Sequence, residues 1–260
     1  MAYTTLEIKY LGEVATITLS RPEKRNAISS AMLDEMPQAL SEIEKSSARV
    51  AILTGAGKAF CSGMDLADLK ALATNTPKEN LEDSRRMVTM FYSIYTFPKP
   101  LIAAVNGAAI AGGCIVSTLC DFTLAVPGAK FGYTEVRIGF IPALVSVFLT
   151  RQIGEKRTRD LLLTGRLFES EEAFQMGLVT EIVPPEKLME RANELAATLL
   201  ANSPTSLMRT KALLHANAKD VLEKELEVAV RENAAIRSTK DFQEGLASFL
   251  EKRKPVWKGE

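Results

Sequence analysis

The chain has 260 residues, of which 47% are hydrophobic and 25% charged, a composition typical of a globular protein with a sizeable core. Its 32 basic and 32 acidic residues give a formal net charge of zero, which argues against global attraction to nucleic acid or to an anionic membrane. The three cysteines form no Cys-x-x-Cys pair, and residues 1–10 lack the apolar core of a signal peptide. We therefore expect a reducing, cytoplasmic location.

Predicted strands and helices alternate along the first hundred residues. Clusters of β-branched residues predict strands, and apolar residues at intervals of three and four predict helices. The expected elements are a strand hairpin over 4–10 and 14–20 with Gly12 between the strands, a helix over 30–46 with Pro37 as a candidate kink, a strand over 50–54, and a charged helix over 78–95.

A glycine-rich turn over residues 55–63 follows the third predicted strand and fits none of the common nucleotide or nucleophile motifs. The dinucleotide fingerprint needs a third glycine where Phe60 stands, and a P-loop needs a longer glycine spacing with Ser or Thr after the lysine. A serine-hydrolase elbow around Ser62 needs glycines where Phe60 and Met64 stand. The turn is therefore interpreted as a strand end with exposed backbone.

Residues 101–121 carry no charge until Asp121. Apolar residues 102–105 predict a buried strand, Asn106-Gly107 a turn, and Gly112-Gly113 the start of a second apolar segment of helical length. The unpaired N–H groups at a helix start can hold an anion or a carbonyl oxygen that is gaining negative charge. A transmembrane helix is the disfavoured alternative, because glycine and polar residues interrupt the stretch.

The second half continues the alternation and then becomes entirely helical. The expected elements are a strand over 122–126, helices over 145–149 and 156–163, a short helix capped by Ser170 and ended by Gly177, a strand over 178–183, and helical faces over 188–199, 207–215, 222–229 and 241–252. This order predicts an α/β fold with a largely parallel sheet. We expect a core domain over 1–195 and a C-terminal helical region over 196–260.

Carboxylates are the strongest candidates for proton transfer. The single histidine, His215, lies within a helical segment without a nucleophile motif, so it is interpreted as structural, and no metal site is expected. Glu135 stands out because its neighbours are mostly apolar, and burial can raise the pKa of a carboxyl group into the range of general acid–base catalysis. An ion pair with Arg137, two residues on, is the alternative that remains open.

Four separated blocks, in this order, resemble the enoyl-CoA hydratase/isomerase family, the crotonase superfamily, over about residues 14–257. The blocks are Arg-Pro-Glu-Lys-Arg-Asn-Ala at 21–27, Lys-Ala-Phe-Cys-Ser-Gly-Met-Asp-Leu at 58–66, Pro-Leu-Ile-Ala-Ala-Val-Asn-Gly-Ala-Ala-Ile-Ala-Gly-Gly-Cys at 100–114, and Lys-Phe-Gly-Tyr-Thr-Glu-Val-Arg-Ile-Gly at 130–139. The resemblance implies a crotonase-like spiral of ββα-type turns with a C-terminal helical trimerisation region. It also implies an acyl-CoA thioester as substrate, no permanently bound cofactor, self-association as a trimer or a dimer of trimers, and no nucleic-acid or membrane partner.

The same resemblance implies a set of site residues. The thioester carbonyl would lie between the backbone N–H groups of Met64 and Gly112, and Glu135 would be the catalytic acid and base. The implied substrate-binding residues, which surround the nucleotide, the pantetheine and the acyl group, are Lys24, Arg25, Ala27, Ala59, Ser62, Gly63, Asp65, Leu66, Gly113, Phe249 and Lys252. Without the resemblance, the basic run that begins at Lys252 would be interpreted as a solvated tail.

Two departures from the family pattern bear on the reaction. Two-glutamate hydratases have a glutamate where Ile115 stands, so Glu135 is left as the single carboxylate. Residues 141–147 lack the usual glycines, which suggests a reshaped acyl pocket and a resemblance to hydratases of branched, methylglutaconyl-type thioesters. The sequence favours a lyase of fatty acid metabolism that hydrates a short or branched 2-enoyl-CoA. A 3-enoyl to 2-enoyl-CoA isomerase and a non-catalytic acyl-CoA-binding subunit are the alternatives.

Overall fold

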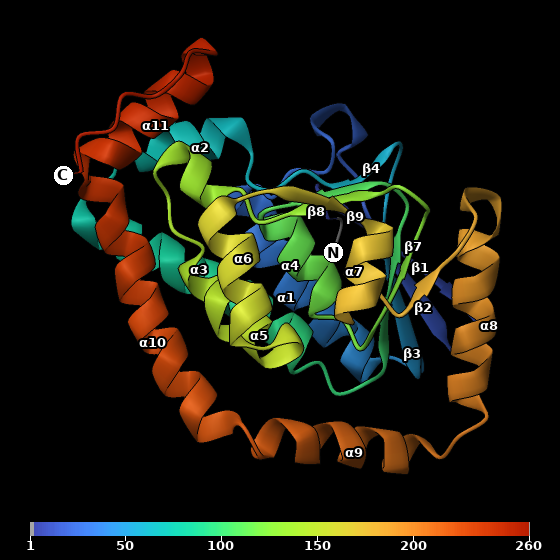
Figure 1. The fold of residues 1–260 in the computed structure, drawn as a ribbon. Coiled ribbons are helices and arrows are strands. Elements are labelled where there is room, and N and C mark those ends of the chain that lie inside the picture. The colour runs from blue at the N-terminus through green and yellow to red at the C-terminus, as the bar shows by residue number, and fades with distance from the viewer. Residues whose placement is uncertain (1–2, 260) are drawn as a thin grey trace.

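Two β-sheets form the centre of the computed structural model, which describes residues 3–259 (Figure 1). One sheet has six strands in the order β1-β2-β3-β5-β7-β10, and the other has four in the order β4-β6-β8-β9. The strands are β1 Leu6–Leu11, β2 Val14–Leu19, β3 Val50–Gly55, β4 Ala59–Cys61, β5 Leu101–Val105, β6 Ala108–Ile110, β7 Phe122–Ala125, β8 Lys130–Gly132, β9 Leu167–Glu169 and β10 Glu181–Ile182.

The six-stranded sheet is parallel apart from its first hairpin. Strands β1 and β2 pair antiparallel, with Leu6 opposite Leu19, and every further pair in this sheet is parallel. The central strand β5 is buried at all five positions, which suits a strand covered on both faces. The predicted α/β fold with a largely parallel sheet is therefore confirmed.

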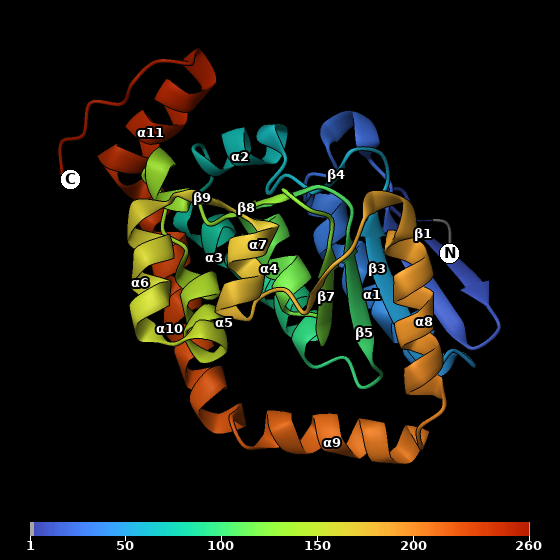
Figure 2. The same cartoon turned by 45° about the vertical axis from the view of Figure 1, so that its right-hand side comes forward.

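Helices cover both faces of this sheet. Helix α8 packs against β3, β5 and β7, and Figures 1 and 2 show it on the side away from α1 and α3, which pack together. The helices are α1 Ser30–Lys45, α2 Leu66–Leu72, α3 Pro77–Tyr95, α4 Gly112–Thr118, α5 Ala143–Ile153, α6 Glu155–Thr164, α7 Ser170–Met176, α8 Leu188–Leu200, α9 Pro204–Ala216, α10 Lys219–Ala235 and α11 Lys240–Glu251. Short 3₁₀ turns are η1 Pro22–Lys24, η2 Glu135–Ile138, η3 Pro185–Lys187 and η4 Ile236–Ser238.

The predicted elements differ from the structure mainly where elements are short. The sequence analysis missed the strands β4, β6, β8 and β9, because three residues are too few to show a period of two. It also missed the helix α2, whose seven residues make only about two turns. The strand expected over 178–183 is reduced to the edge pair Glu181–Ile182. Ser170 is the first helical residue and not the cap, because its hydroxyl donates to the Val126 carbonyl, whereas Gly177 ends α7 with φ 83° as expected.

The transmembrane alternative for residues 101–121 is wrong. This stretch forms two strands and the seven-residue helix α4, all of them packed inside the fold. None of the helices within residues 3–259 combines the length and the apolar composition that crossing a bilayer requires.

The last four helices wrap around the core. In Figures 1 and 2, α9 runs along the outside and connects α8 on one side with α10 on the other. Only Lys211 of α9 is buried, and several large apolar side chains of α9 and α10 are more than a third exposed. They are Met208, Leu213, Leu214, Val221 and Val228. The outer surface of these helices is therefore unusually apolar for one that faces solvent.

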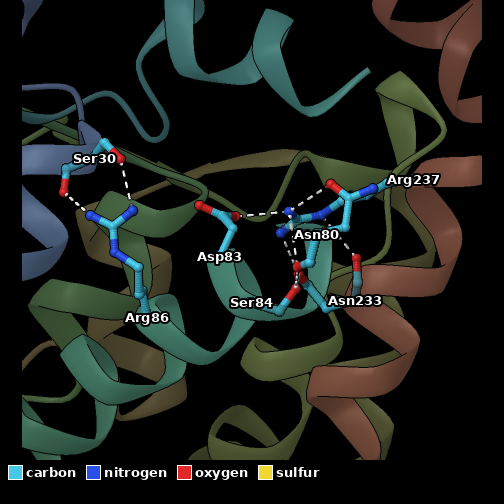
Figure 3. Close-up of polar contacts among 7 residues, drawn as sticks. All are labelled: Ser30, Asn80, Asp83, Ser84, Arg86, Asn233 and Arg237. Carbon is cyan, nitrogen blue, oxygen red and sulfur yellow. Dashed lines mark hydrogen bonds and ion pairs between the residues drawn. The ribbon is translucent and has the colours of Figure 1, made fainter. Parts of the chain in front are cut away.

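A buried arginine ties the C-terminal helices to α3 (Figure 3). Arg237 is 1% exposed, and its Nη1 lies 2.8 Å from Asp83 Oδ2. Its Nη2 donates to Asn233 Oδ1 at 2.8 Å, and the same oxygen accepts a 2.8 Å hydrogen bond from Ser84 Oγ. The guanidinium also lies 5.7 Å from the centre of the Phe140 ring. This network, called the Arg237 network below, fixes the position of α10 relative to α3.

We predict that Arg237→Leu lowers the free energy of unfolding by about 3–5 kcal/mol, because it leaves the Asp83 carboxylate without its cation in a mostly buried place. Arg231→Leu is the matched control, because Arg231 lies in α10, directly before the turn η4 that carries Arg237, and pairs with Glu227 in solvent, an interaction worth about 0.5 kcal/mol or less. Urea denaturation of both variants measures the difference. Equal losses would show that the buried pair does not stabilise the chain.

Candidate functional site

The mouth of α4 and the turn after β4 are in unusually close contact. A Cβ atom on Gly113 would lie 2.2 Å from the Cys61 carbonyl oxygen, so no other residue fits at position 113 without a shift of backbone. On the other side of the contact, Gly63 has φ 89°, and a Cβ there would lie 3.1 Å from the Ile110 carbonyl oxygen. Glycines at both places let two turns that are distant in sequence meet backbone to backbone.

This contact brings together two backbone N–H groups that have no partner among the described residues, those of Met64 and Gly112. Gly112 is the first residue of α4, where an N–H has no acceptor within the helix. Ala111 before it has φ 48° and ψ −120°, a conformation that costs of order 1–3 kcal/mol in a residue other than glycine. Because Ala111 N donates to the Gly132 carbonyl at 2.7 Å, strand β8 helps to hold this strained turn.

The loop of residues 24–28 runs alongside the turn after β4. Three backbone hydrogen bonds join them: Ser62 N donates to Arg25 O at 3.1 Å, Ile28 N to Gly63 O at 2.7 Å, and Asp65 N to Ile28 O at 2.8 Å. Lys24 and Arg25 are exposed at the tip of this loop. These hydrogen bonds hold the loop against the turn after β4, so the exposed side chains of Lys24 and Arg25 lie near that turn. Exposed cations of this kind can bind an anionic group.

Asp65 has a structural role in this arrangement. Its side chain accepts hydrogen bonds from the Ala67 amide at 2.9 Å and from Arg21 Nη2 at 2.8 Å, so it caps α2 and ties that helix to the loop. Burial alone would raise the pKa of Asp65, but these two donors hold it below its ordinary value. The sequence analysis placed Asp65 along the substrate path; this stays a prediction, and the structure shows that its carboxylate is engaged by Ala67 and Arg21.

Glu135 lies in η2, directly after β8, and is not part of an extended segment. Its Oε2 atom is shielded from solvent and has no hydrogen-bond partner among the described residues. Burial raises the pKa of this carboxyl group from 4.5 to about 7. No ion pair joins it to Arg137 within residues 3–259, so the structural alternative for Glu135 is not supported.

One cavity is lined both by Glu135 and by Met64 and Gly112, the residues that carry the two unpaired N–H groups. Its wall is mostly apolar and combines residues from the turn after β4, α2, α3, the mouth of α4, η2, α5, α10 and α11. The residues that line it are Ile28, Ser62, Met64, Leu69, Met87, Phe91, Ile110, Ala111, Gly112, Thr134, Glu135, Ile138, Phe140, Ile141, Pro142, Ala143, Leu144, Val145, Asn233 and Phe249. The cavity thus has a titratable carboxyl group and a pair of hydrogen-bond donors on an apolar background.

Five of the candidate site residues from the sequence line this cavity: Ser62, Met64, Gly112, Glu135 and Phe249. The other candidates do not line it. Those that are buried are Ala27, Ala59, Gly63, Asp65 and Gly113, and those that are exposed are Lys24, Arg25, Leu66 and Lys252.

Several lining residues escaped the sequence analysis. Ala111 carries no sequence signal for its left-handed backbone, because alanine rarely adopts it. Phe91, Phe140 and Asn233 come from helical or turn segments that look like ordinary core, and only their packing shows that they face the cavity. The glycine turns are visible in the sequence, but the apolar wall of the cavity is not.

The remaining chemical candidates are structural. His215 is half-buried, and its ring centre lies 4.8 Å from that of Tyr95, away from the cavity residues. The three cysteines are buried free thiols, and burial raises their pKa values well above the ordinary range of a thiol. Within residues 3–259, no group of three His, Cys, Asp or Glu side chains could hold a metal ion.

Comparisons with known proteins agree with this geometry. A Thermus thermophilus protein, named as a proposed enoyl-CoA hydratase, is 46% identical over 245 residues, which cover 94% of this chain and 97% of that protein. A Clostridium acetobutylicum protein named short-chain-enoyl-CoA hydratase is 33% identical over 250 residues, which cover 94% of this chain and 93% of that protein. The crystal structure of an enoyl-CoA hydratase from Bacillus halodurans superposes with a TM-score of 0.88 at 29% identity, over 94% of this chain and all of that one.

The matched region of the family extends through the whole site. The sequence model of the enoyl-CoA hydratase/isomerase family matches residues 10–260, which include the loop of cations, both glycine turns, Glu135 and the C-terminal helices. The similarity covers both the sequence and the fold of the chain. The chain belongs to the enoyl-CoA hydratase/isomerase family.

Proposed function

We propose that this protein reversibly adds water to a short or branched 2-enoyl-CoA. The observation that supports this most directly is the single cavity that holds the unpaired Met64 and Gly112 N–H groups together with the protonatable carboxyl of Glu135. The two N–H groups would bind the thioester carbonyl oxygen, whose negative charge grows as the enolate forms. Glu135 would be the catalytic acid and base.

One carboxyl group is enough to transfer the proton in both steps of this reaction. The Glu135 carboxylate accepts a proton from water while the water oxygen bonds to carbon 3, and the double-bond electrons move to the thioester oxygen held by the two N–H groups. The protonated Glu135 then returns that proton to carbon 2, and the enolate collapses to the 3-hydroxyacyl thioester. A pKa of about 7 suits a group that must both accept and donate a proton near neutral pH.

The substrate class follows from the shape and charge of the site. Ile141 and Leu144 narrow a wall where many family members have glycines, which favours a short or branched acyl group. The name of the Clostridium relative, a short-chain-enoyl-CoA hydratase, supports the same class. Lys24 and Arg25 would bind the phosphates of coenzyme A, and Lys252, the residue that follows α11, would add a third cation, so the neutral chain needs no global positive charge.

We also propose self-association through residues 196–260. The exposed apolar side chains of α9 and α10, with Leu213 65% and Leu214 63% exposed, would be covered by a neighbouring copy. A trimer or a dimer of trimers would do this. The buried free thiols Cys61, Cys114 and Cys120 suit a cytoplasmic location, and the substrate would be the coenzyme A thioester itself, with no permanently bound cofactor.

An isomerase that moves a double bond from the 3- to the 2-position is the second candidate, and Ile115 favours it. Ile115 is fully buried and does not line the cavity, so no second carboxylate comes from this position on α4. One base can lift and return a proton without water. Turnover of a 3-enoyl-CoA without uptake of oxygen from ¹⁸O-labelled water would select this function over hydration.

We predict that Glu135→Gln lowers kcat for hydration of crotonyl-CoA by about 100- to 10,000-fold, because the amide cannot transfer the proton. Glu186→Gln is the matched control, since Glu186 also lies in the first turn of a 3₁₀ helix but is exposed. Steady-state assays of both variants provide the measurement. The proposed function would be refuted if the Glu135→Gln variant kept full activity, or if the wild type did not hydrate any short or branched enoyl-CoA. Tight binding of acyl-CoA by the wild type without turnover would indicate a non-catalytic subunit.

The raised pKa of Glu135 predicts two pH effects. The value of kcat/KM for hydration should rise with pH and level off above about 7, because the free enzyme must hold the carboxylate form. Stability should move in the opposite direction: below pH 4.5 the carboxyl is protonated in both folded and unfolded chains, and as pH rises to about 7 only the unfolded chain ionises freely. The folded state thus loses up to about 3 kcal/mol over this window.

Glu135→Gln should therefore be the more stable protein above pH 7, and its advantage over the wild type should shrink as pH falls toward 4.5. Urea denaturation at pH 5 and pH 8 measures this difference. A constant difference between the two proteins would show that the folded state does not raise the Glu135 pKa.

A further inference from the structure

Asn233 of α10 is a polar residue in an otherwise apolar part of the cavity wall. Its neighbours on that wall include Leu69, Met87 and Phe140. Asn233 is 2% exposed, yet it lines the cavity. In a buried amide, both the NH₂ group and the carbonyl oxygen normally have hydrogen-bond partners.

The acceptor half of the amide is fully engaged. Asn233 Oδ1 accepts 2.8 Å hydrogen bonds from Arg237 Nη2 and from Ser84 Oγ (Figure 3). Because a guanidinium can only donate, Arg237 fixes which end of the amide is the oxygen. The Nδ2 group must then point away from the Arg237 network.

The donor half of the amide has no partner. Within residues 3–259, no hydrogen bond from Asn233 Nδ2 is formed, and Nδ2 is not among the fully buried unpaired side-chain atoms, which are Tyr133 Oη, Glu135 Oε2 and Gln152 Oε1. The Nδ2 atom therefore has no hydrogen-bond partner and is still accessible, and because Asn233 lines the cavity, we infer that Nδ2 faces the cavity space. The hydrogen bond to Arg237 also polarises the amide, which makes Nδ2 a stronger donor.

Asn233, a residue of α10, contacts α3 at some distance along that helix from the mouth of α4. A Cβ on Gly112 would lie 3.9 Å from the Phe91 ring, so Phe91 marks the level of the thioester carbonyl. Asn233 bonds to Ser84, which is seven residues earlier on the same helix, or about 10 Å along its axis. Asn233 therefore contacts α3 at a level different from that of Phe91, on a part of the wall beyond the thioester carbonyl.

We propose that Asn233 is a specificity-determining residue whose Nδ2 donates a hydrogen bond to a neutral oxygen, a hydroxyl or keto group, on the acyl chain beyond carbon 3. The inference rests on the proposed function for the placement of the thioester. A neutral acceptor fits better than a carboxylate, because Asp83 already neutralises the charge of Arg237. A plain alkyl chain would leave the amide donor unpaired, which disfavours it.

The test compares three 2-enoyl-CoA substrates of equal chain length that end in a methyl group, a primary hydroxyl or a carboxylate. The wild type should prefer the hydroxyl substrate, and Asn233→Leu should lower kcat/KM for it by about 10- to 100-fold more than for the methyl substrate, so that the preference is lost. Ser84→Ala is the matched control, because it disturbs the same network but keeps Nδ2, so it should retain the preference.

A readout without turnover keeps this inference separate from the proposed function. Calorimetric binding of the saturated methyl- and hydroxyl-ended acyl-CoAs should show the same preference in the wild type, and its loss in Asn233→Leu, even if the protein hydrates nothing. Equal losses for all acyl-CoAs would place Asn233 against the pantetheine and overturn the proposal. Loss of the preference in Ser84→Ala, or a wild-type preference for the carboxylate, would overturn it as well.

Discussion

The close backbone contact between the turn after β4 and the mouth of α4 is the constraint on which the site depends. Gly113 can lie against the Cys61 carbonyl only because it has no side chain, and Gly63 adopts a left-handed conformation to meet the same contact. The strained Ala111 is held by β8 through a backbone hydrogen bond. The result is a pair of N–H groups without partners, a state that a fold tolerates when a ligand completes it.

The cavity beside this contact separates two kinds of chemistry. Around Glu135 the wall is apolar, and removing the carboxyl group from water is what raises its pKa toward neutrality. The charged residues Lys24 and Arg25 stay at the exposed margin. A polyanionic substrate could therefore be held by its nucleotide end in solvent while the reacting end lies where proton transfer is favourable.

The C-terminal helices connect assembly with the site. Helices α10 and α11 supply Asn233 and Phe249 to the cavity, and Arg237 between them is buried against α3. The exposed apolar side chains on α9 and α10 lie on the other side of the same segment. If neighbouring copies cover that surface, association would also brace the acyl wall, because the Arg237 network transmits the position of α10 to the cavity.

The sequence by itself determined the α/β class, the long helices and the parallel strands, because hydrophobic periods of two and 3.6 residues record burial directly. Its local patterns also marked the two glycine turns and Glu135, and the resemblance to a known family added Met64 and Gly112 as the backbone donors. Only the tertiary structure decided that Asp65 is engaged by Arg21, that Arg137 leaves Glu135 unpaired, and that Asn233 faces the cavity. These facts depend on which distant segments pack together, and no local pattern contains them.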